Sequence, residues 1–126
     1  MKGFYGFGLV FIWLFSIQPD PWVAPEQANN LKNPLGNNPK SIQEGQKIFL
    51  SLCWTCHGQK GKGDGPAAAT LNPKPASLSA ETVQSQSDGA IFWKISEGRG
   101  AMGAYKNNLT TTQRWQLVNY VRTLTK

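Results

Sequence analysis

The stretch Cys53-Trp54-Thr55-Cys56-His57 places two thiols three positions apart and an imidazole directly after the second thiol. A Cys-x-x-Cys-His sequence is the spacing that attaches a c-type haem. The thiols of Cys53 and Cys56 form thioether bonds to the porphyrin, and the imidazole of His57 becomes the proximal ligand of the iron. The motif therefore predicts one covalently attached haem c.

Two other chemistries also use a Cys-x-x-Cys pair. A structural zinc site usually needs four ligands, whereas this sequence has two cysteines and one histidine. A thioredoxin-like dithiol opens a helix in a βαβ setting, whereas a loop rich in glycine and proline follows His57. Both alternatives are therefore less favoured than haem attachment, and no cysteine remains for a disulfide.

Size and composition point to one small domain. The chain has 126 residues, of which 40% are hydrophobic, and its mean hydropathy is −0.38. These values favour a soluble globular body over a polytopic membrane protein. Residues 41–126 form the one stretch long enough for a compact domain. Domains of this size commonly need a staple, and a covalently held, largely apolar porphyrin would supply it.

The formal net charge is +6, from 13 basic and 7 acidic residues. The basic residues are scattered, and no run or basic patch interleaved with aromatic residues indicates nucleic-acid binding. A diffuse positive surface suits fast, salt-sensitive docking to redox partner proteins with acidic surfaces. The open alternative is a basic surface that is merely solvated.

The first 40 residues divide into two segments. Residues 1–18 have a charged start at Lys2 and a short apolar core, which are the features of an export signal. The apolar run is shorter than the ~20 residues that comfortably span a bilayer. A good cleavage site is missing, so an uncleaved N-terminal anchor stays open. Residues 19–40 are rich in proline and asparagine and are expected to form a linker or a strap over the domain. The signal predicts a place in the periplasm or on the outer face of the bacterial inner membrane.

The first helix is predicted to begin at Ser41, which forms a capping box with Glu44. Its apolar residues lie along one side and lead into Cys53; they are Ile42, Gly45, Phe49 and Leu52.

Four further helical segments follow the haem motif. Short turns are expected at residues 66–69 and, capped by Ser79, through about Gln84. A helix is expected from Ser87 or Asp88 to Gly98, and a last helix from Thr110 or Thr111. Alternating strand patterns are absent. The fold class is therefore predicted to be all-α, with roughly three to five short helices around the haem.

These features together resemble the class I monohaem c-type cytochromes of bacteria. The resemblance covers residues 41–126 and includes the sequences GDGPAA at 63–68 and GAIFWKISEG at 89–98. It implies the cytochrome c fold. It also implies that the first and last helices cross at Gly45 and Tyr120, where a small residue lets the two backbones approach.

The resemblance implies two further site residues. Met102, the one methionine besides the initiator, corresponds to the sixth ligand of the iron. Pro66, nine positions after His57, corresponds to the proline whose carbonyl oxygen accepts the Nδ1–H of the imidazole. Gly103 follows Met102 where the family commonly has proline, a departure that concerns the stiffness of the loop more than the ligand. An open sixth site or Lys/Asn ligation remains an alternative for Met102. For Pro66 the alternatives are ordinary turn chemistry and the same role taken by Pro73 or Pro75.

The expected function is electron transfer rather than catalysis. A His/Met-ligated haem would carry single electrons between respiratory partners outside the cytoplasm. Two alternatives stay open: a haem enzyme or sensor with an open sixth site, and a haem-binding subunit of a larger membrane respiratory complex.

Overall fold

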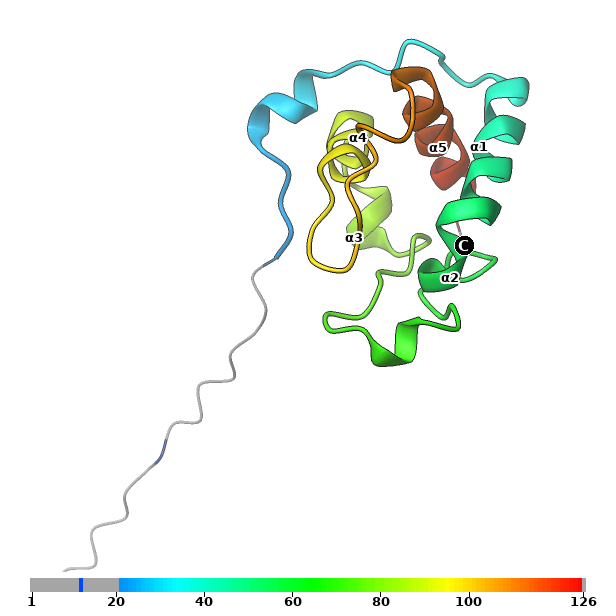
Figure 1. The fold of residues 1–126 in the computed structure, drawn as a ribbon. Coiled ribbons are helices and arrows are strands. Elements are labelled where there is room, and N and C mark those ends of the chain that lie inside the picture. Colours follow the sequence, from blue (N-terminus) through cyan, green and yellow to red (C-terminus); the bar gives the residue numbers. More distant parts are fainter. Residues whose placement is uncertain (1–11, 13–20, 126) are drawn as a thin grey trace, which may run out of the picture.

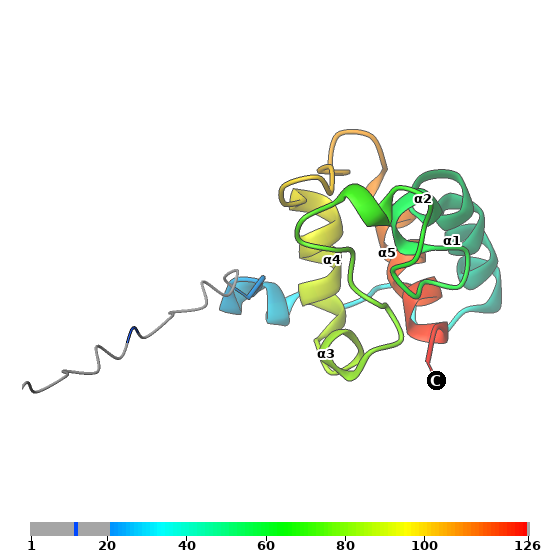
Figure 2. The same cartoon turned by 90° about the horizontal axis from the view of Figure 1, so that it is seen from below.

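The computed structural model describes residues 12 and 21–125, and within this part of the chain every regular element is a helix (Figure 1). The helices are η1 (Glu26–Asn30), α1 (Pro39–Leu52), α2 (Trp54–His57), η2 (Ala68–Thr70), α3 (Glu81–Gln84), α4 (Asp88–Glu97) and α5 (Thr111–Thr123). The predicted all-α class is confirmed. Helix α5 packs against α1 on one side and against α4 on another, as both views show (Figures 1 and 2).

Helix α1 begins two residues before the predicted start. Its N-cap is Asn38, whose side chain accepts hydrogen bonds from the backbone N–H groups of Lys40 and Ser41. Pro39 occupies the first helical position, where proline is favoured because its missing N–H is not needed. The predicted capping box of Ser41 and Glu44 is therefore wrong. Ser41 instead lies inside the first turn, is buried, and its Oγ accepts a hydrogen bond from Asn119 Nδ2 at 2.7 Å.

The crossing of α1 and α5 is built around Gly45, as predicted. A Cβ atom at Gly45 would overlap the backbone carbonyl oxygen of Gln116 and would lie 3.0 Å from Cβ of Tyr120. One turn further along α1, Phe49 packs on Tyr120 with their ring centroids 5.1 Å apart. The glycine costs helix stability, and the close approach of the two backbones is the reason it stands there.

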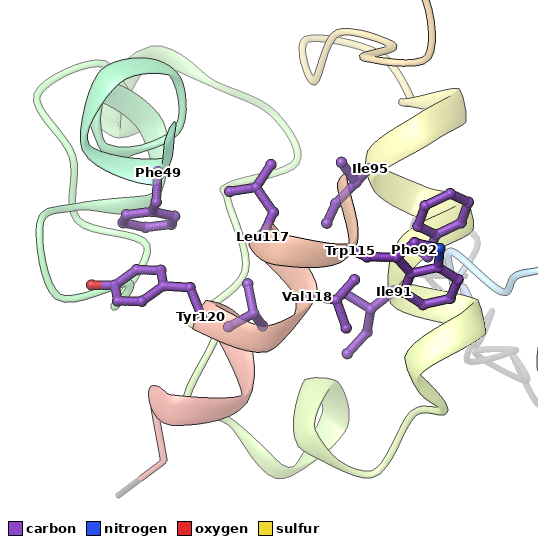
Figure 3. Packing of buried hydrophobic residues seen from close by; sticks show 9 residues of the cluster. Phe49, Ile91, Phe92, Ile95, Trp115, Leu117, Val118 and Tyr120 are labelled. Atoms are coloured by element: carbon purple, nitrogen blue, oxygen red, sulfur yellow. The ribbon is translucent and has the colours of Figure 1, made fainter. Parts of the chain in front are cut away.

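The core continues from this crossing to α4 (Figure 3). Leu117 and Val118 of α5 are almost completely buried. Trp115 stacks on Phe92 of α4 at a centroid distance of 4.0 Å. Buried aromatic and aliphatic residues of α1, α4 and α5 thus form one continuous hydrophobic cluster, of which Ile95 of α4 is a member.

The predicted ends of α4 and α5 agree with the structure. Ser87 caps α4 by accepting the N–H of Ala90, and Gly98 follows its last residue. Thr110 caps α5 and forms a reciprocal capping box with Gln113. Side-chain acceptors at these positions satisfy backbone N–H groups that have no partner inside the helix.

Residues 21–38, which we call the strap, run from beside α4 to the start of α1 (Figure 1). The segment was expected to be extended and irregular, yet it contains η1 and a buried residue, Ala28. The strap is also held by α5, because Asn119 Nδ2 donates to the carbonyl oxygen of Gly36 at 2.9 Å and Asn119 Oδ1 accepts from Asn33 Nδ2 at 2.6 Å. It is therefore an integral part of the fold rather than a loose linker.

Within residues 12 and 21–125, the search for a helix with the length and apolar character of a membrane span finds none. The predicted export signal, residues 1–18, lies outside the described residues except for Ile12.

Candidate haem-binding site

The two cysteines of the motif lie in one short helical turn directly after α1. Cys53 precedes α2, and Cys56 stands near its end, so that one turn separates the two thiols. Both are half-buried and neither forms a disulfide. Burial, with a smaller effect of the neighbouring Cys56, raises the pKa of the Cys53 thiol to about 12. The half-buried Cys53 thiol is therefore protonated at neutral pH.

His57 is oriented by a backbone carbonyl. Its Nδ1–H donates to the carbonyl oxygen of Ala76, with Nδ1 and O separated by 3.2 Å. Burial lowers the pKa of the imidazole, and the hydrogen bond to Ala76 acts in the opposite direction. The neutral ring with its proton on Nδ1 leaves the lone pair of Nε2 for a metal.

The hydrogen bond expected from Pro66 is thus made by Ala76, and the assignment to Pro66 is wrong. The loop after α2 folds back on that helix instead: Gly63 N–H donates to His57 O at 2.7 Å, and Ala67 N–H donates to Thr55 O at 3.0 Å. These bonds hold the loop against the backbone carbonyls of α2, while the side chain of His57 points to a later segment. Pro66 itself is exposed.

The close return of this loop explains its glycine content. A Cβ at Gly65 would overlap the carbonyl oxygen of Thr55, and Gly63 has a φ of +77°, a region that other residues rarely adopt. The loop therefore covers the backbone of the haem motif at a distance that side chains would prevent.

Met102 lies in a reverse turn after α4. Arg99 and Met102 exchange two backbone hydrogen bonds, N to O, of 2.9 and 3.1 Å. The turn is tied to the end of α4 because Tyr105 N–H donates to Ile95 O at 3.1 Å. Gly100, inside the turn, has a φ of +58°. Backbone hydrogen bonds therefore stiffen this loop although glycine, Gly103, and not proline follows Met102.

Cys53, His57 and Met102 line one cavity of about 650 Å³. This volume falls in the range of ~300–1,000 Å³ that is typical of ligand pockets. Apolar side chains of α1, α3, α4, α5 and the loop before α3 make up much of the remaining wall; they include Phe49, Leu78, Val83, Ile91, Leu117 and Val121. Thiol, imidazole and thioether donors in an apolar wall fit a haem c. Cys56 is half-buried in the same turn but is not part of the cavity lining.

Three residues of the cavity wall were not assigned to the haem site from the sequence. Tyr105, in the segment after Met102, lines the cavity. Trp22 of the strap and Lys94 of α4 line it too. Lys94 stands three positions after Ile91 and so shares a helical face with it, a signal that could have placed it. In the sequence, Trp22 stands out only as a large apolar residue in a polar segment.

The described part of the chain, residues 12 and 21–125, has no cluster of three or more His, Cys, Asp or Glu residues with the arrangement of a metal site. The zinc alternative therefore gains no support from the structure.

Comparison with known proteins adds a family. The profile of the family described as cytochrome c matches residues 42–125. A cytochrome c6 from Gloeothece citriformis is 32% identical over 104 residues, which cover 79% of this chain and 76% of that protein.

Solved structures give the same picture. A chain of the reducing HAO-like protein complex of Kuenenia stuttgartiensis superposes with a TM-score of 0.66 and is 27% identical. The match covers 86% of the present chain but only about half (52%) of the Kuenenia chain. The c-type cytochrome KustC0563 has a TM-score of 0.55 and 30% identity, and the match covers 65% of this chain and 98% of that one. Cytochrome cL from Methylophaga aminisulfidivorans shares the fold, with a TM-score of 0.59 and 24% identity. This match covers 87% of the present chain and 71% of cytochrome cL.

A helical fold around an apolar cavity with a Cys-x-x-Cys-His motif in its wall defines a c-type cytochrome domain. The chain belongs to the cytochrome c family. Haem c is its cofactor, Cys53 and Cys56 fit the Cys-x-x-Cys-His motif, and haem-based electron transfer is its general function.

Proposed function

We propose that this chain is a monohaem electron carrier whose iron is ligated by His57 and Met102. Haem c supplies the exchange of one electron between the ferric and ferrous states. The observation that carries the proposal is that the imidazole and the thioether, 45 positions apart in the sequence, line the same apolar cavity.

The residues of the site favour a reduced iron. The thioether of Met102 is a soft donor, which raises the midpoint potential relative to a second imidazole. An apolar wall disfavours the additional charge of the oxidised centre and acts in the same direction. The Ala76 carbonyl fixes the ring of His57, and the hydrogen-bonded turn limits the movement of Met102. Ligands that move little on reduction suit fast electron transfer.

The substitution Met102→Leu tests the ligand set. We expect the oxidised protein to lose the weak absorption band near the red edge that His/Met ligation produces. The reduced variant should bind carbon monoxide, whereas the wild type should not. Met102→His is the matched control, because it restores a sixth ligand with a lower midpoint potential. An unchanged spectrum after Met102→Leu would refute ligation by Met102.

The same experiment separates the carrier from a haem enzyme or sensor. An enzyme or sensor needs an open or exchangeable sixth position, so its reduced wild-type form would bind carbon monoxide rapidly. Slow or absent binding by the wild type supports the carrier.

Docking partners with acidic surfaces are proposed from charge. The chain carries six more basic than acidic residues. Each ion pair, such as Lys106–Glu97 or Arg122–Asp88, neutralises one positive and one negative charge and so leaves this difference unchanged. An excess of positive charge therefore remains for a partner. The rate of electron exchange with an acidic redox protein should fall steeply as ionic strength rises. A rate that does not depend on salt would contradict this part of the proposal.

Export to the periplasm or to the outer face of the inner membrane rests on residues 1–18. The mass of the mature protein distinguishes a cleaved signal from a retained anchor, and cell fractionation tests the compartment. Recovery of the haem protein in the cytoplasm would contradict export.

A place in a larger respiratory complex is a second candidate, favoured by the similarity to a chain whose structure was determined in a complex. Purification from membranes under mild detergent distinguishes the two. A carrier is recovered alone, whereas a subunit migrates with other membrane proteins at a constant ratio.

A further inference from the structure

We propose that the strap, residues 21–38, belongs to the haem site: Trp22 and its neighbours form one wall of the cavity and exclude water from it. The family profile begins at residue 42, so this wall is contributed from outside the part of the chain that the family defines.

The strap reaches the same cavity as the predicted iron ligands. Pro21, Trp22, Val23, Ala24 and Asn29 line it together with His57 and Met102. A porphyrin that is bonded to the motif and fills this cavity would therefore contact the strap.

Trp22 is held in place by two cations. Nζ of Lys94 lies 5.3 Å and Cζ of Arg99 lies 5.9 Å from the centroid of its ring, which are cation–π distances. Lys94 is fixed further, since its Nζ donates to Oε1 of Gln86 at 2.6 Å. Burial, and to a smaller extent the charge of Arg99, lowers the pKa of Lys94. The electron-rich face of Trp22 offsets part of the unfavourable placement of both cations.

The strap is anchored at two points behind Trp22. At the first, η1 packs directly on α4: a Cβ at Gly89 would overlap the carbonyl oxygen of Ala28, and Ser87 Oγ donates to Asn29 Oδ1 at 2.5 Å. At the second, the side chain of Asn33 donates to that of Asn119 in α5.

These contacts give the strap an effect on the iron. A wall that excludes water disfavours the oxidised, more highly charged state, and the cations beside Trp22 act in the same direction. Detaching the strap should therefore lower the midpoint potential while the thioether bonds stay intact.

Contact with the porphyrin can be observed directly by NMR of the reduced, low-spin wild-type protein. The ring current of the porphyrin shifts protons that lie against it. We expect the indole protons of Trp22, assigned by their absence in Trp22→Phe, to resonate away from the positions of an exposed tryptophan. Unshifted indole resonances would overturn the proposal.

Two variants test the consequence in the intact, haem-loaded chain. Trp22→Ala removes the wall, and Gly89→Ala displaces η1 with a residue that suits the helix α4. Both should lower the midpoint potential, and Gly89→Ala should increase amide exchange at residues 26–35 at least tenfold. Leu31→Ala is the control, because Leu31 belongs to the strap, is 42% exposed and does not line the cavity.

Equal midpoint potentials for Trp22→Ala, Gly89→Ala and Leu31→Ala would refute the proposal. The absorption band of the His/Met iron is recorded on the same samples. Its presence with an unchanged potential would reject the strap alone and leave the proposed ligand set standing.

Discussion

The α1–α5 crossing and the haem cavity lie next to each other and are built in different ways. At the crossing, protein atoms fill the available space: Tyr120 is 7% exposed and Val118 is completely buried. The cavity is walled by segments that are distant in the sequence, among them the strap, the end of α1, the Ala76–Leu78 segment and the Met102 loop.

The difference shows which part of the fold the polypeptide completes alone. Side chains interdigitate at the crossing, so its stability depends on their packing. The walls of the cavity face a common space of about 650 Å³ rather than one another. The fixed arrangement of these walls therefore depends more on the haem bonded inside the cavity than on contacts between the walls. The predictions below test this contrast, beginning with the largest expected effect.

Removal of both thiols should affect the cavity far more than the crossing. In the variant Cys53→Ser/Cys56→Ser we expect complete loss of covalent haem, seen as loss of haem staining on a denaturing gel. Amide exchange should then increase more, by at least about tenfold, in the 76–84 and 99–105 segments than in α1 and α5. A single Cys53→Ser variant is the control, because one thioether position remains. Uniform acceleration along the chain would contradict the contrast.

Gly45→Ala should disturb the crossing and leave the cavity residues in place. In an ordinary helix this change stabilises by about 1 kcal/mol. Here the added Cβ overlaps the Gln116 carbonyl oxygen, and such overpacking costs about 1–3 kcal/mol. Because the overlapped atom belongs to the backbone, we expect the upper end of this range, about 3 kcal/mol. After subtraction of the helix gain of about 1 kcal/mol, the net loss in the free energy of unfolding by guanidinium should be roughly 2 kcal/mol, followed in the haem absorption.

The control for this prediction is Gln46→Ala, which makes a similar change at the next, exposed position of α1. It should leave the free energy of unfolding nearly unchanged. A Gly45→Ala protein as stable as this control would show that the two backbones can separate at no cost.

The sequence predicted the parts of the fold that depend on local rules. The caps at Ser87 and Thr110 and the end of α4 at Gly98 follow from short-range hydrogen bonding, and all are found. The predicted start of α1 was wrong although helix starts are set by local sequence. Asn38-Pro39 competes with Ser41 as a helix start, and the asparagine with proline after it is the stronger combination.

The residues of the haem site also fall into two groups, those that the sequence identifies and those that only the fold reveals. The motif residues and Met102 were found because their donor types are rare in this chain. The carbonyl of Ala76 and the ring of Trp22 were not, since each reaches the site through the path of the backbone in three dimensions. Every residue offers a carbonyl group, so residue type alone does not identify the one that meets His57 Nδ1.

The smallest expected effect concerns the capping box of α5, on the crossing side of the contrast. Thr110→Ala removes the acceptor of the Gln113 N–H, a bond of 3.1 Å, and should cost about 1 kcal/mol in the free energy of unfolding. Thr112→Ala, at an exposed position of the same helix, is the control and should cost nothing.

Because the Thr110 N–H also donates to Oε1 of Gln113 at 2.9 Å, the two side chains form a reciprocal pair. The double variant Thr110→Ala/Gln113→Ala should therefore lose less stability than the sum of the two single variants. Strict additivity in unfolding titrations would mean that the two bonds act separately. The crossing of α5 with Gly45 and Phe49 of α1 would then need no cooperation between the two bonds of the cap at its end.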